Sequence, residues 1–338
     1  MNHGVINDSN ETNIDNFFIQ LYDITSIIAL PLAIIGLISN IFVLYIFITD
    51  RNFHKPTYYL IMISVTSDII TAISMTYGYS HILARTTDDN GADIMCQSAV
   101  YITATSYTIS IMNLCLIAFD RYCNIVKAVS QFNRLYKNNF LLFVEISIWI
   151  TAVIINAPLI LVMESKNKDY GLCDFIPITN IISAYLIFLV IMLYIIPSTF
   201  IVTVYVKIII FRKNYVSPAT NNAEQIEEDA QKKRFIKALM SIAISYVCFT
   251  WPYFATILGY AITKKTYYQL RFTDKVAYVT SLLSRSLTTS ITIISPFTYL
   301  LFDSNIRKRA VKVCKQLLGL ESNRQRRLHH IRVMSSAR

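Results

Sequence analysis

Charged residues that interrupt long apolar stretches are the side chains of this sequence with the greatest potential for chemistry. Asp120, Arg121 and Tyr122 stand together at the end of a long run without charge. Asp68 lies inside the segment SVTSD, and Arg285 lies inside SLLSRSLTTS. An ionisable side chain within an apolar span is costly to bury, so each of them predicts a functional role. Because no nucleophile–base pair and no metal-ligand spacing stands out in the sequence, we expect neither an enzyme nor a metal site.

Each of these residues also has a purely structural interpretation. Arg121 could be the charged end of an ordinary spanning helix, with its stem lying along the apolar surface. Asp68 could be buried for packing specificity alone. Arg285 could be paired internally with Asp174. The elements around these residues have to decide between the two interpretations.

Composition places these residues in a membrane protein. Of the 338 residues, 54% are hydrophobic and only 15% are charged, whereas a soluble domain is about 25% charged. Seven apolar runs each reach the roughly 20 residues that a spanning helix needs. The runs are Ile24–Thr49, Thr57–Leu83, Ile94–Phe119, Asn138–Met163, Phe175–Val206, Ala238–Thr263 and Val276–Phe302. We therefore expect an all-α membrane protein whose seven-transmembrane helix bundle covers residues 24–302.

Two further segments follow the last apolar run. Residues 303–320 alternate basic and apolar side chains at helical spacing, which predicts a short amphipathic helix on the membrane surface, in contact with lipids. Cys314 in this segment is a candidate for palmitoylation. Residues 321–338 form a basic cytoplasmic tail with a composition typical of disorder.

The distribution of basic residues predicts the orientation of the chain. With the N-terminus outside, 23 of the 31 lysine and arginine residues fall in inner loops and the C-terminal tail, as the positive-inside rule requires. The net charge of +10 is then a feature of the inner membrane surface, and we expect no nucleic-acid partner. Residues 1–23 would form the extracellular N-terminus, with glycosylation patterns at Asn7 and Asn10.

Cysteine positions agree with this orientation. Of the six cysteines, Cys96 and Cys173 are the two expected at outer, oxidising ends, so we predict a disulfide between them. The 25 steps from Cys96 to Arg121 span about 38 Å of α-helix, against a bilayer core of about 30 Å. One helix would thus place its cysteine at one membrane surface and its Asp120-Arg121 pair at the other.

The order of these features resembles that of a rhodopsin-family (class A) G-protein-coupled receptor. The resemblance covers about Ile24–Leu320. The matching residues are Asn40, Asp68, Cys96, Asp120, Arg121, Tyr122, Trp149, Pro197, Tyr205, Pro252, Pro296 and Tyr299. This resemblance implies a plasma-membrane receptor that binds an extracellular ligand and activates a heterotrimeric G protein.

The subfamily is not assigned by the sequence. The segments DRYCNI and RLYK are faintly similar to melatonin-like receptors. Opsins hold a lysine seven residues before the proline of the last span, and Thr289 stands there, which excludes covalent retinal. Amine receptors place an aspartate eighteen residues before the arginine that corresponds to Arg121, and Thr103 stands there.

The resemblance assigns coupling roles at the inner end of the bundle. Asp120 would pair with Arg121 in the resting state. Tyr205 and Tyr299 would meet Arg121 in the active state. The expected coupling residues are Asp120, Arg121, Tyr122, Tyr205, Pro296 and Tyr299. In many relatives an acidic residue at the inner end of the sixth span also pairs with this arginine and so locks the resting state. That stretch here is Lys232-Lys233-Arg234, with Glu228 and Asp229 a turn below, so we expect a weakened lock and ligand-free signalling.

Two departures from the family pattern affect expected sites. Ser295 stands where the family has asparagine, so a sodium-ion site formed by Asp68, Ser110 and Ser295 would be weak. Trp251, in the span Ala238–Thr263, comes one position later than the tryptophan of the corresponding family span, which rotates it by about 100° on the helix. Its role in activation is therefore left open.

The outer halves of the spans would form a ligand pocket around Arg285. This residue lies eleven positions before Pro296, or about 16 Å towards the outside. The expected lining is Tyr79, Thr103, Tyr107, Trp251, Tyr253, Phe254 and Arg285. A guanidinium among aromatic rings, with no aspartate at Thr103, predicts an anionic ligand such as a peptide C-terminus or a small acid.

Two other classes of protein remain as alternatives. A transporter or channel would need ionisable groups along a path through the membrane, but the spans offer Asp68, Glu145 and Arg285 at different depths. A receptor that binds ligand without coupling would share the bundle, although it would have no use for Asp120 and Arg121.

Overall fold

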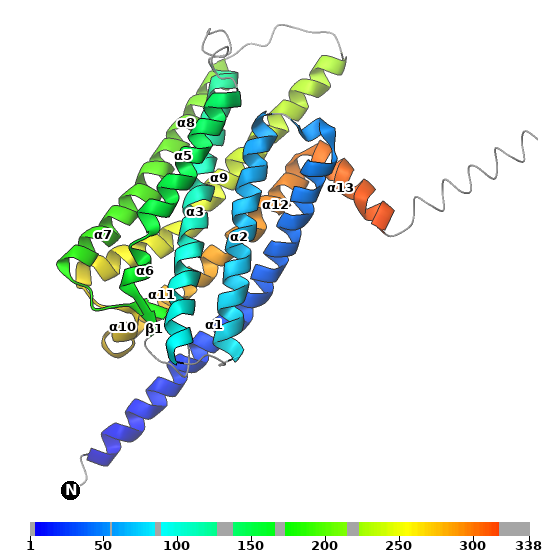
Figure 1. Cartoon of the computed structure of the whole chain (residues 1–338). Coiled ribbons are helices and arrows are strands. Elements are labelled where there is room, and N and C mark those ends of the chain that lie inside the picture. The colour runs from blue at the N-terminus through cyan, green and yellow to red at the C-terminus, as the bar shows by residue number, and fades with distance from the viewer. Residues whose placement is uncertain are drawn as a thin grey trace, which may run out of the picture.

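The computed structural model describes residues 4–54, 56–84, 89–126, 138–165, 173–214 and 223–317. Within these ranges the chain is a bundle of long helices with one small sheet (Figure 1). The long helices are α1 (Gly4–Thr49), α2 (Pro56–Ala84), α3 (Asp89–Ile125), α5 (Asn138–Asn156), α7 (Asn180–Val190), α8 (Ile196–Asn214), α9 (Ala223–Thr263), α11 (Lys275–Thr289), α12 (Ile291–Phe302) and α13 (Ser304–Leu317). The predicted all-α membrane bundle is confirmed.

Short elements connect the long helices. They are a 3₁₀ turn η1 (Arg51–Phe53), helix α6 (Leu159–Val162), strands β1 (Met163–Ser165) and β2 (Cys173–Phe175), a π-helical segment η2 (Ile191–Ile195) and helix α10 (Tyr267–Thr273). The π-helical segment joins α7 to α8 without a break, two residues before Pro197. A residue inserted into the helical ladder just before a proline relieves the clash that the proline ring would otherwise make.

Six helical segments of the described chain are long and apolar enough to cross a membrane. The seventh expected span, Val276–Phe302, is divided into α11 and α12 at Ser290. The hydroxyl groups of Thr288 and Thr289 both donate to the carbonyl of Arg285, at 2.7 and 3.3 Å. Such side-chain hydrogen bonds compete with the helical ladder and bend helices. The two pieces still run through the bundle one after the other (Figure 1).

Helix α1 is longer than its apolar run. The sequence suggested a polar segment over residues 1–23, but the helix begins at Gly4 and continues to Thr49. Neither glycine nor proline occurs between Gly4 and Pro31 to end it. Asn7 and Asn10, the predicted glycosylation positions, fall in this helical backbone, and their side chains lie outside the described part.

Helices α1 and α12 approach each other closely where glycine permits it. A Cβ atom on Gly36 would lie 2.5 Å from the Thr292 side-chain hydroxyl. One turn further, Asn40 is fully buried and its amide donates to the Thr292 carbonyl at 2.6 Å. This contact fixes the position of α12, which carries Ser295, Pro296 and Tyr299.

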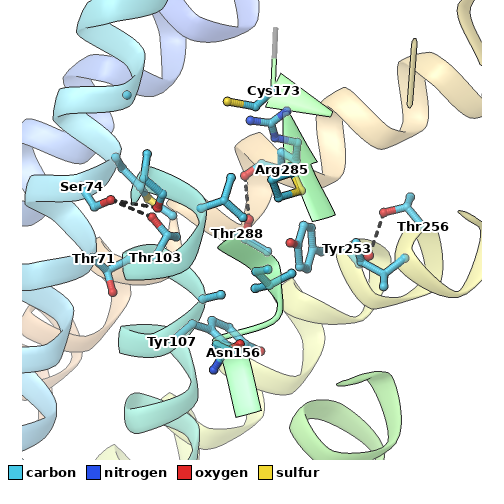
Figure 2. Close-up of a pocket in the computed structure, with 18 of the residues that line it drawn as sticks. Thr71, Ser74, Thr103, Tyr107, Asn156, Cys173, Tyr253, Thr256, Arg285 and Thr288 are labelled. Atoms are coloured by element: carbon cyan, nitrogen blue, oxygen red, sulfur yellow. Dashed lines mark hydrogen bonds between the residues drawn. The ribbon is translucent and has the colours of Figure 1, made fainter. Parts of the chain in front are cut away.

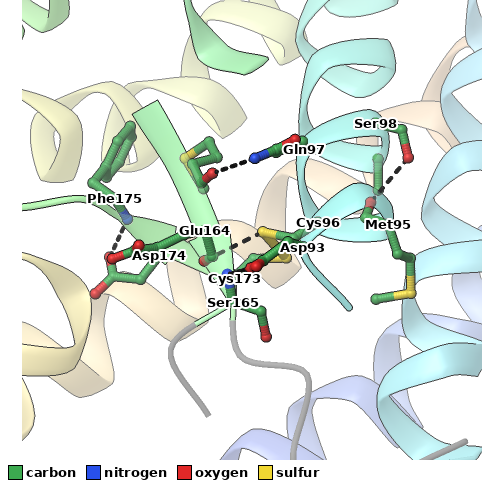
Figure 3. Close-up of a disulfide and its surroundings, with 12 residues drawn as sticks. Asp93, Met95, Cys96, Gln97, Ser98, Glu164, Ser165, Cys173, Asp174 and Phe175 are labelled. Atoms are coloured by element: carbon green, nitrogen blue, oxygen red, sulfur yellow. Dashed lines mark hydrogen bonds between the residues drawn. A yellow bond between two sulfur atoms is a disulfide. The ribbon is translucent and has the colours of Figure 1, made fainter. Parts of the chain in front are cut away.

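The hairpin of β1 and β2 covers the end of the bundle that contains Cys96. The strands pair antiparallel, with Met163 opposite Phe175. Cys173 on β2 forms a disulfide with Cys96 on α3, with Cα atoms 5.4 Å apart, as predicted (Figure 3). Asp93 accepts a hydrogen bond from the backbone of Ser165 at 2.7 Å. We call this end of the molecule the disulfide end.

Helix α13 lies across the opposite end of the bundle, which we call the arginine end after Arg121 (Figure 1). It is amphipathic, because Ile306, Ala310 and Val313 are buried whereas the lysines beside them are exposed. Cys314 is exposed on this helix. The predicted surface helix reached residue 320; the described helix ends at Leu317, and the predicted tail, residues 321–338, lies outside the described part.

Candidate functional site

A cavity of about 230 Å³ lies inside the bundle beneath the hairpin (Figure 2). Helices α1, α2, α3, α9 and α11 and strand β2 contribute to its wall. Six of the residues expected to form a pocket line it: Tyr79, Thr103, Tyr107, Tyr253, Phe254 and Arg285. Thr103 donates a hydrogen bond to Ser74 at 3.0 Å, so the position at which amine receptors hold an aspartate carries a neutral hydroxyl pair.

Trp251, the seventh expected pocket residue, does not line the cavity. Its side chain is 55% exposed on the outside of the bundle. The reason is helical register, because Trp251 is rotated by about 100° from its neighbour Thr250. Thr250 is the residue that points inward, and its hydroxyl donates to the carbonyl of Tyr246 at 2.8 Å.

Aromatic rings from three helices fill the space below the cavity in place of a tryptophan. The Tyr107 ring on α3 lies 5.1 Å from that of Tyr246 and 5.7 Å from that of Phe254, both on α9. Phe254 also stacks on Tyr194 of η2 at 5.2 Å. The Tyr246 hydroxyl donates to the carbonyl of Tyr107 at 3.2 Å. The cavity floor thus connects α3 directly with α9.

The charged end of the cavity contains Arg285, close to the Cys173 strand (Figure 2). The hydroxyl groups of six tyrosines in the described residues lie within electrostatic range of its guanidinium: Tyr22, Tyr79, Tyr253, Tyr260, Tyr267 and Tyr278. Tyr22 belongs to the segment expected to be a polar N-terminus, and Tyr267 belongs to a loop helix. Neither periodicity nor a motif in the sequence could have placed either of them at the pocket.

Asp174, the suggested partner of Arg285, is engaged elsewhere. Its carboxylate accepts hydrogen bonds from the backbone N–H groups of Phe175, Tyr267 and Tyr268, at 2.8, 3.1 and 2.7 Å. Burial raises the pKa of this carboxyl, and the N–H groups, that of Tyr268 foremost, oppose the shift. Asp174 therefore joins the hairpin to the start of α10 across the top of the cavity.

Asp68 lies at the deep end of the same cavity, on α2. Its carboxylate accepts a hydrogen bond from Ser110 on α3 at 2.8 Å, and Ser110 is in turn 2.5 Å from the hydroxyl of Ser67. Ser295 is buried on α12 and is not among the residues that line the cavity. A carboxylate and hydroxyls form a donor set of the hard oxygen type that small cations prefer.

Glu145, the remaining acid of the spans, lies away from the cavity on α5. It is buried and accepts a hydrogen bond from the Trp149 indole one turn later, at 3.0 Å. Asn113 on α3 lies beside the same carboxyl, so Glu145 connects α5 with α3 at a place that does not line the cavity.

The arginine end holds the expected coupling residues. The Arg121 guanidinium contacts Asp120 through two nitrogens, at 2.7 and 3.1 Å, and Asn124 donates to the same carboxylate at 3.0 Å. The Tyr205 hydroxyl lies within electrostatic range of both Arg121 and Tyr299. Pro296 is buried and Tyr122 is half-buried.

The stretch of α9 in which many relatives carry a second acidic partner for the arginine is described in part. Lys233 and Arg234 are exposed near the start of α9. The side chains of Glu228, Asp229 and Lys232 lie outside the described part of the structure.

Comparisons with known proteins agree with this arrangement. The sequence profile described as 7 transmembrane receptor (rhodopsin family) matches residues 39–318. The chain is 27% identical over 142 residues to the human histamine H4 receptor, covering 41% of this chain and 35% of the relative. It is 29% identical over 189 residues to the human 5-hydroxytryptamine receptor 1D, covering 54% and 48%. The chain therefore spans about half, or less, of the length of these curated relatives.

The profile match extends from one residue before Asn40 to the residue after the end of α13, and so includes the cavity, the disulfide and the Asp120-Arg121 pair. This chain belongs to the rhodopsin family of seven-transmembrane receptors.

Proposed function

We propose that the chain is a G-protein-coupled receptor of the plasma membrane, with the disulfide end outside and the arginine end inside. The excess of basic residues at the arginine end supports this orientation. The observation that carries the proposal is the separation of two sites in one bundle, a cavity under the disulfide hairpin and a paired arginine at the far end of α3.

A ligand in the cavity would act by population shift. It binds the active arrangement of helices better than the resting one and so favours it. The ring contacts between Tyr107 and Tyr246 transmit the change from α3 to α9. The inner ends of α8 and α9 then move outward, Arg121 leaves Asp120, and a heterotrimeric G protein docks at the exposed arginine. Tyr205 and Tyr299 would then meet the released side chain; the nearness of Tyr205 to Arg121, and of Tyr299 to Tyr205, supports these roles.

Two accessory features belong to this proposal. Asp68 and Ser110 would hold a sodium ion that favours the resting arrangement, and the site is weak because Ser295 does not reach the cavity. Cys314 is exposed on α13 and would carry a palmitoyl chain that anchors this helix to the inner leaflet.

An amine receptor is the second candidate, because the relatives include a histamine receptor and a serotonin receptor. Their similarity covers only part of this chain. The neutral Thr103–Ser74 pair and the positive Arg285 make the cavity a poor site for an ammonium ion. We therefore propose a ligand with negative charge.

Signalling in transfected cells tests the receptor function without a known ligand. We expect G-protein reporter activity above empty vector, because α9 carries the exposed basic residues Lys233 and Arg234 where many family members have an acid that pairs with the arginine. Arg121→Ala should abolish this activity, whereas Lys265→Ala, an exposed basic residue at the disulfide end, should preserve it. Equal activity of wild type and Arg121→Ala at equal surface expression would contradict the proposal.

A further inference from the structure

Arg285 keeps its positive charge without a carboxylate partner in the described structure. The acids that line the cavity are Asp68 and Asp174. Asp174 is occupied by three backbone N–H groups. Asp68 lies eleven residues before Tyr79 on α2, which is about 16 Å along the helix from the level of Arg285. Arg285 is half-buried and lines the cavity. A charge enclosed there without a partner is costly, so its retention calls for an external group that pairs with it.

The tyrosines around Arg285 supply further hydrogen-bond donors. The hydroxyls of Tyr22 and Tyr267 are buried. That of Tyr22 lies beside the Arg285 guanidinium and that of Tyr267 beside Tyr278, but neither contact has the geometry of a hydrogen bond. Tyr79 is already bonded to Thr289, at 3.0 Å. Buried polar groups without partners are rare in folded proteins. Two phenol hydroxyls beside a guanidinium form a convergent set of donors, which suits the oxygens of an acid group.

The rest of the cavity is apolar and small. Met75, Val100, Leu189, Phe254 and Ile257 are among the residues that form its walls. Its volume of about 230 Å³ is below the roughly 300–1,000 Å³ of pockets for drug-sized ligands. The hairpin, tied by the disulfide and by Asp174, covers the charged end. The small volume and the apolar walls favour a compact molecule over the end of a peptide.

We propose that the cavity binds a small amphiphilic acid, with its acid group on Arg285, Tyr22 and Tyr267 and its apolar body against Phe254. The proposal deepens the receptor function stated above, on which it depends for its role in signalling. An aliphatic acid released from lipid and a soluble aromatic acid share this chemistry, and the two sources can be separated by experiment.

Ligand-induced stabilisation of the purified full-length receptor in lipid nanodiscs is the test. The probes are carboxylates from butanoate to dodecanoate and 3-phenylpropanoate, each compared with its primary amide and its amine. We expect at least one acid to raise the melting temperature in a saturable manner, while the matched amide and amine do not. The preferred probe, alkyl or aryl, identifies the source.

Variants assign the effect to the donors. Arg285→Ala should abolish the acid response, Arg285→Lys should retain part of it, and Tyr22→Phe and Tyr267→Phe should each weaken binding roughly tenfold, as expected for a hydrogen bond to a charged group. Lys275→Ala is the matched control, since this exposed lysine lies on the same helix. If Arg285→Ala does not fold, the two phenylalanine variants decide.

Three results would overturn the proposal: an acid response in Arg285→Ala equal to wild type, stabilisation by the amines in place of the acids, or no response to any acid of the series at millimolar concentration. The measurement contains no G protein. Acid binding without G-protein activation would therefore count against the receptor function alone, and activation without acid binding would count against this site alone.

Discussion

Substitution of Gly36 by alanine is expected to destabilise the bundle at the contact between α1 and α12. The added Cβ would lie 2.5 Å from the Thr292 hydroxyl oxygen and 3.1 Å from its Cβ, whereas carbon atoms in good contact are about 3.5–4.0 Å apart. Rotation of the Thr292 side chain would break the hydrogen bond from its hydroxyl to the Thr289 carbonyl, at 2.9 Å, and would leave its Cβ in place. One of the helices must shift.

The magnitude follows from two opposing terms. Overpacking of a tight contact costs about 1–3 kcal/mol, and replacement of glycine by alanine in a helix returns up to about 1 kcal/mol. With a packing cost near the middle of its range, about 2 kcal/mol, less a return of about 1 kcal/mol, we expect a net loss of about 1 kcal/mol for Gly36→Ala. Gly259→Ala is the control, since no atom lies within 4 Å of its Cβ position, so this variant should be neutral or slightly more stable.

Thermal unfolding of the purified protein in detergent measures this difference. Thr292→Ala removes the hydroxyl that clashes, so the double variant should lose less stability than the two single variants together. The packing argument is refuted if Gly36→Ala melts at or above the wild-type temperature while Gly259→Ala behaves as stated.

Three further predictions concern the cavity. Asp174→Ala leaves three backbone N–H groups without their acceptor and should lower stability by about 1–3 kcal/mol. Asp174→Asn should lose less. Equal melting temperatures of Asp174→Ala and wild type would argue against the connection between the hairpin and α10. The melting temperature of the wild type in sodium is compared with that in N-methyl-D-glucamine, and Asp68→Asn should remove the difference. An undiminished sodium effect in the variant would place the ion elsewhere. Tyr107→Ala removes ring contacts to Tyr246 and Phe254 worth about 0.5–1.5 kcal/mol each, so ligand-free signalling should rise several-fold. Tyr107→Phe keeps the ring contacts, and its signalling should stay near that of the wild type. Unchanged signalling in Tyr107→Ala would exclude this transmission route.

The features that depend on helical spacing could be predicted from the sequence. The apolar runs gave the spans, and positive charge together with cysteine position predicted the disulfide between Cys96 and Cys173. The same spacing placed Thr103, Tyr107 and Arg285 around one cavity. These predictions succeed because a membrane helix shows one face to the bundle over its whole length.

Features that depend on contacts between distant segments could not be predicted. Tyr22 and Tyr267 reach Arg285 from a long first helix and from a loop helix, neither of which follows from local periodicity. An internal pair of Asp174 with Arg285 was the structural alternative, but the N–H groups at the start of α10 take the Asp174 carboxylate. Trp251 was included because of its residue type, although its one-position shift already indicated an outward direction.

Nucleotide exchange on a purified G protein tests the central claim most directly. The receptor, reconstituted in lipid nanodiscs, is mixed with a panel of heterotrimeric G proteins, and binding of a non-hydrolysable GTP analogue is followed with and without an acid that stabilises the receptor. We expect wild type to accelerate exchange on at least one G protein, with a further increase on addition of the acid. Arg121→Ala should bind the acid but leave exchange at the rate of empty nanodiscs. Exchange at that basal rate for wild type with every G protein, or full exchange by Arg121→Ala, would contradict the account.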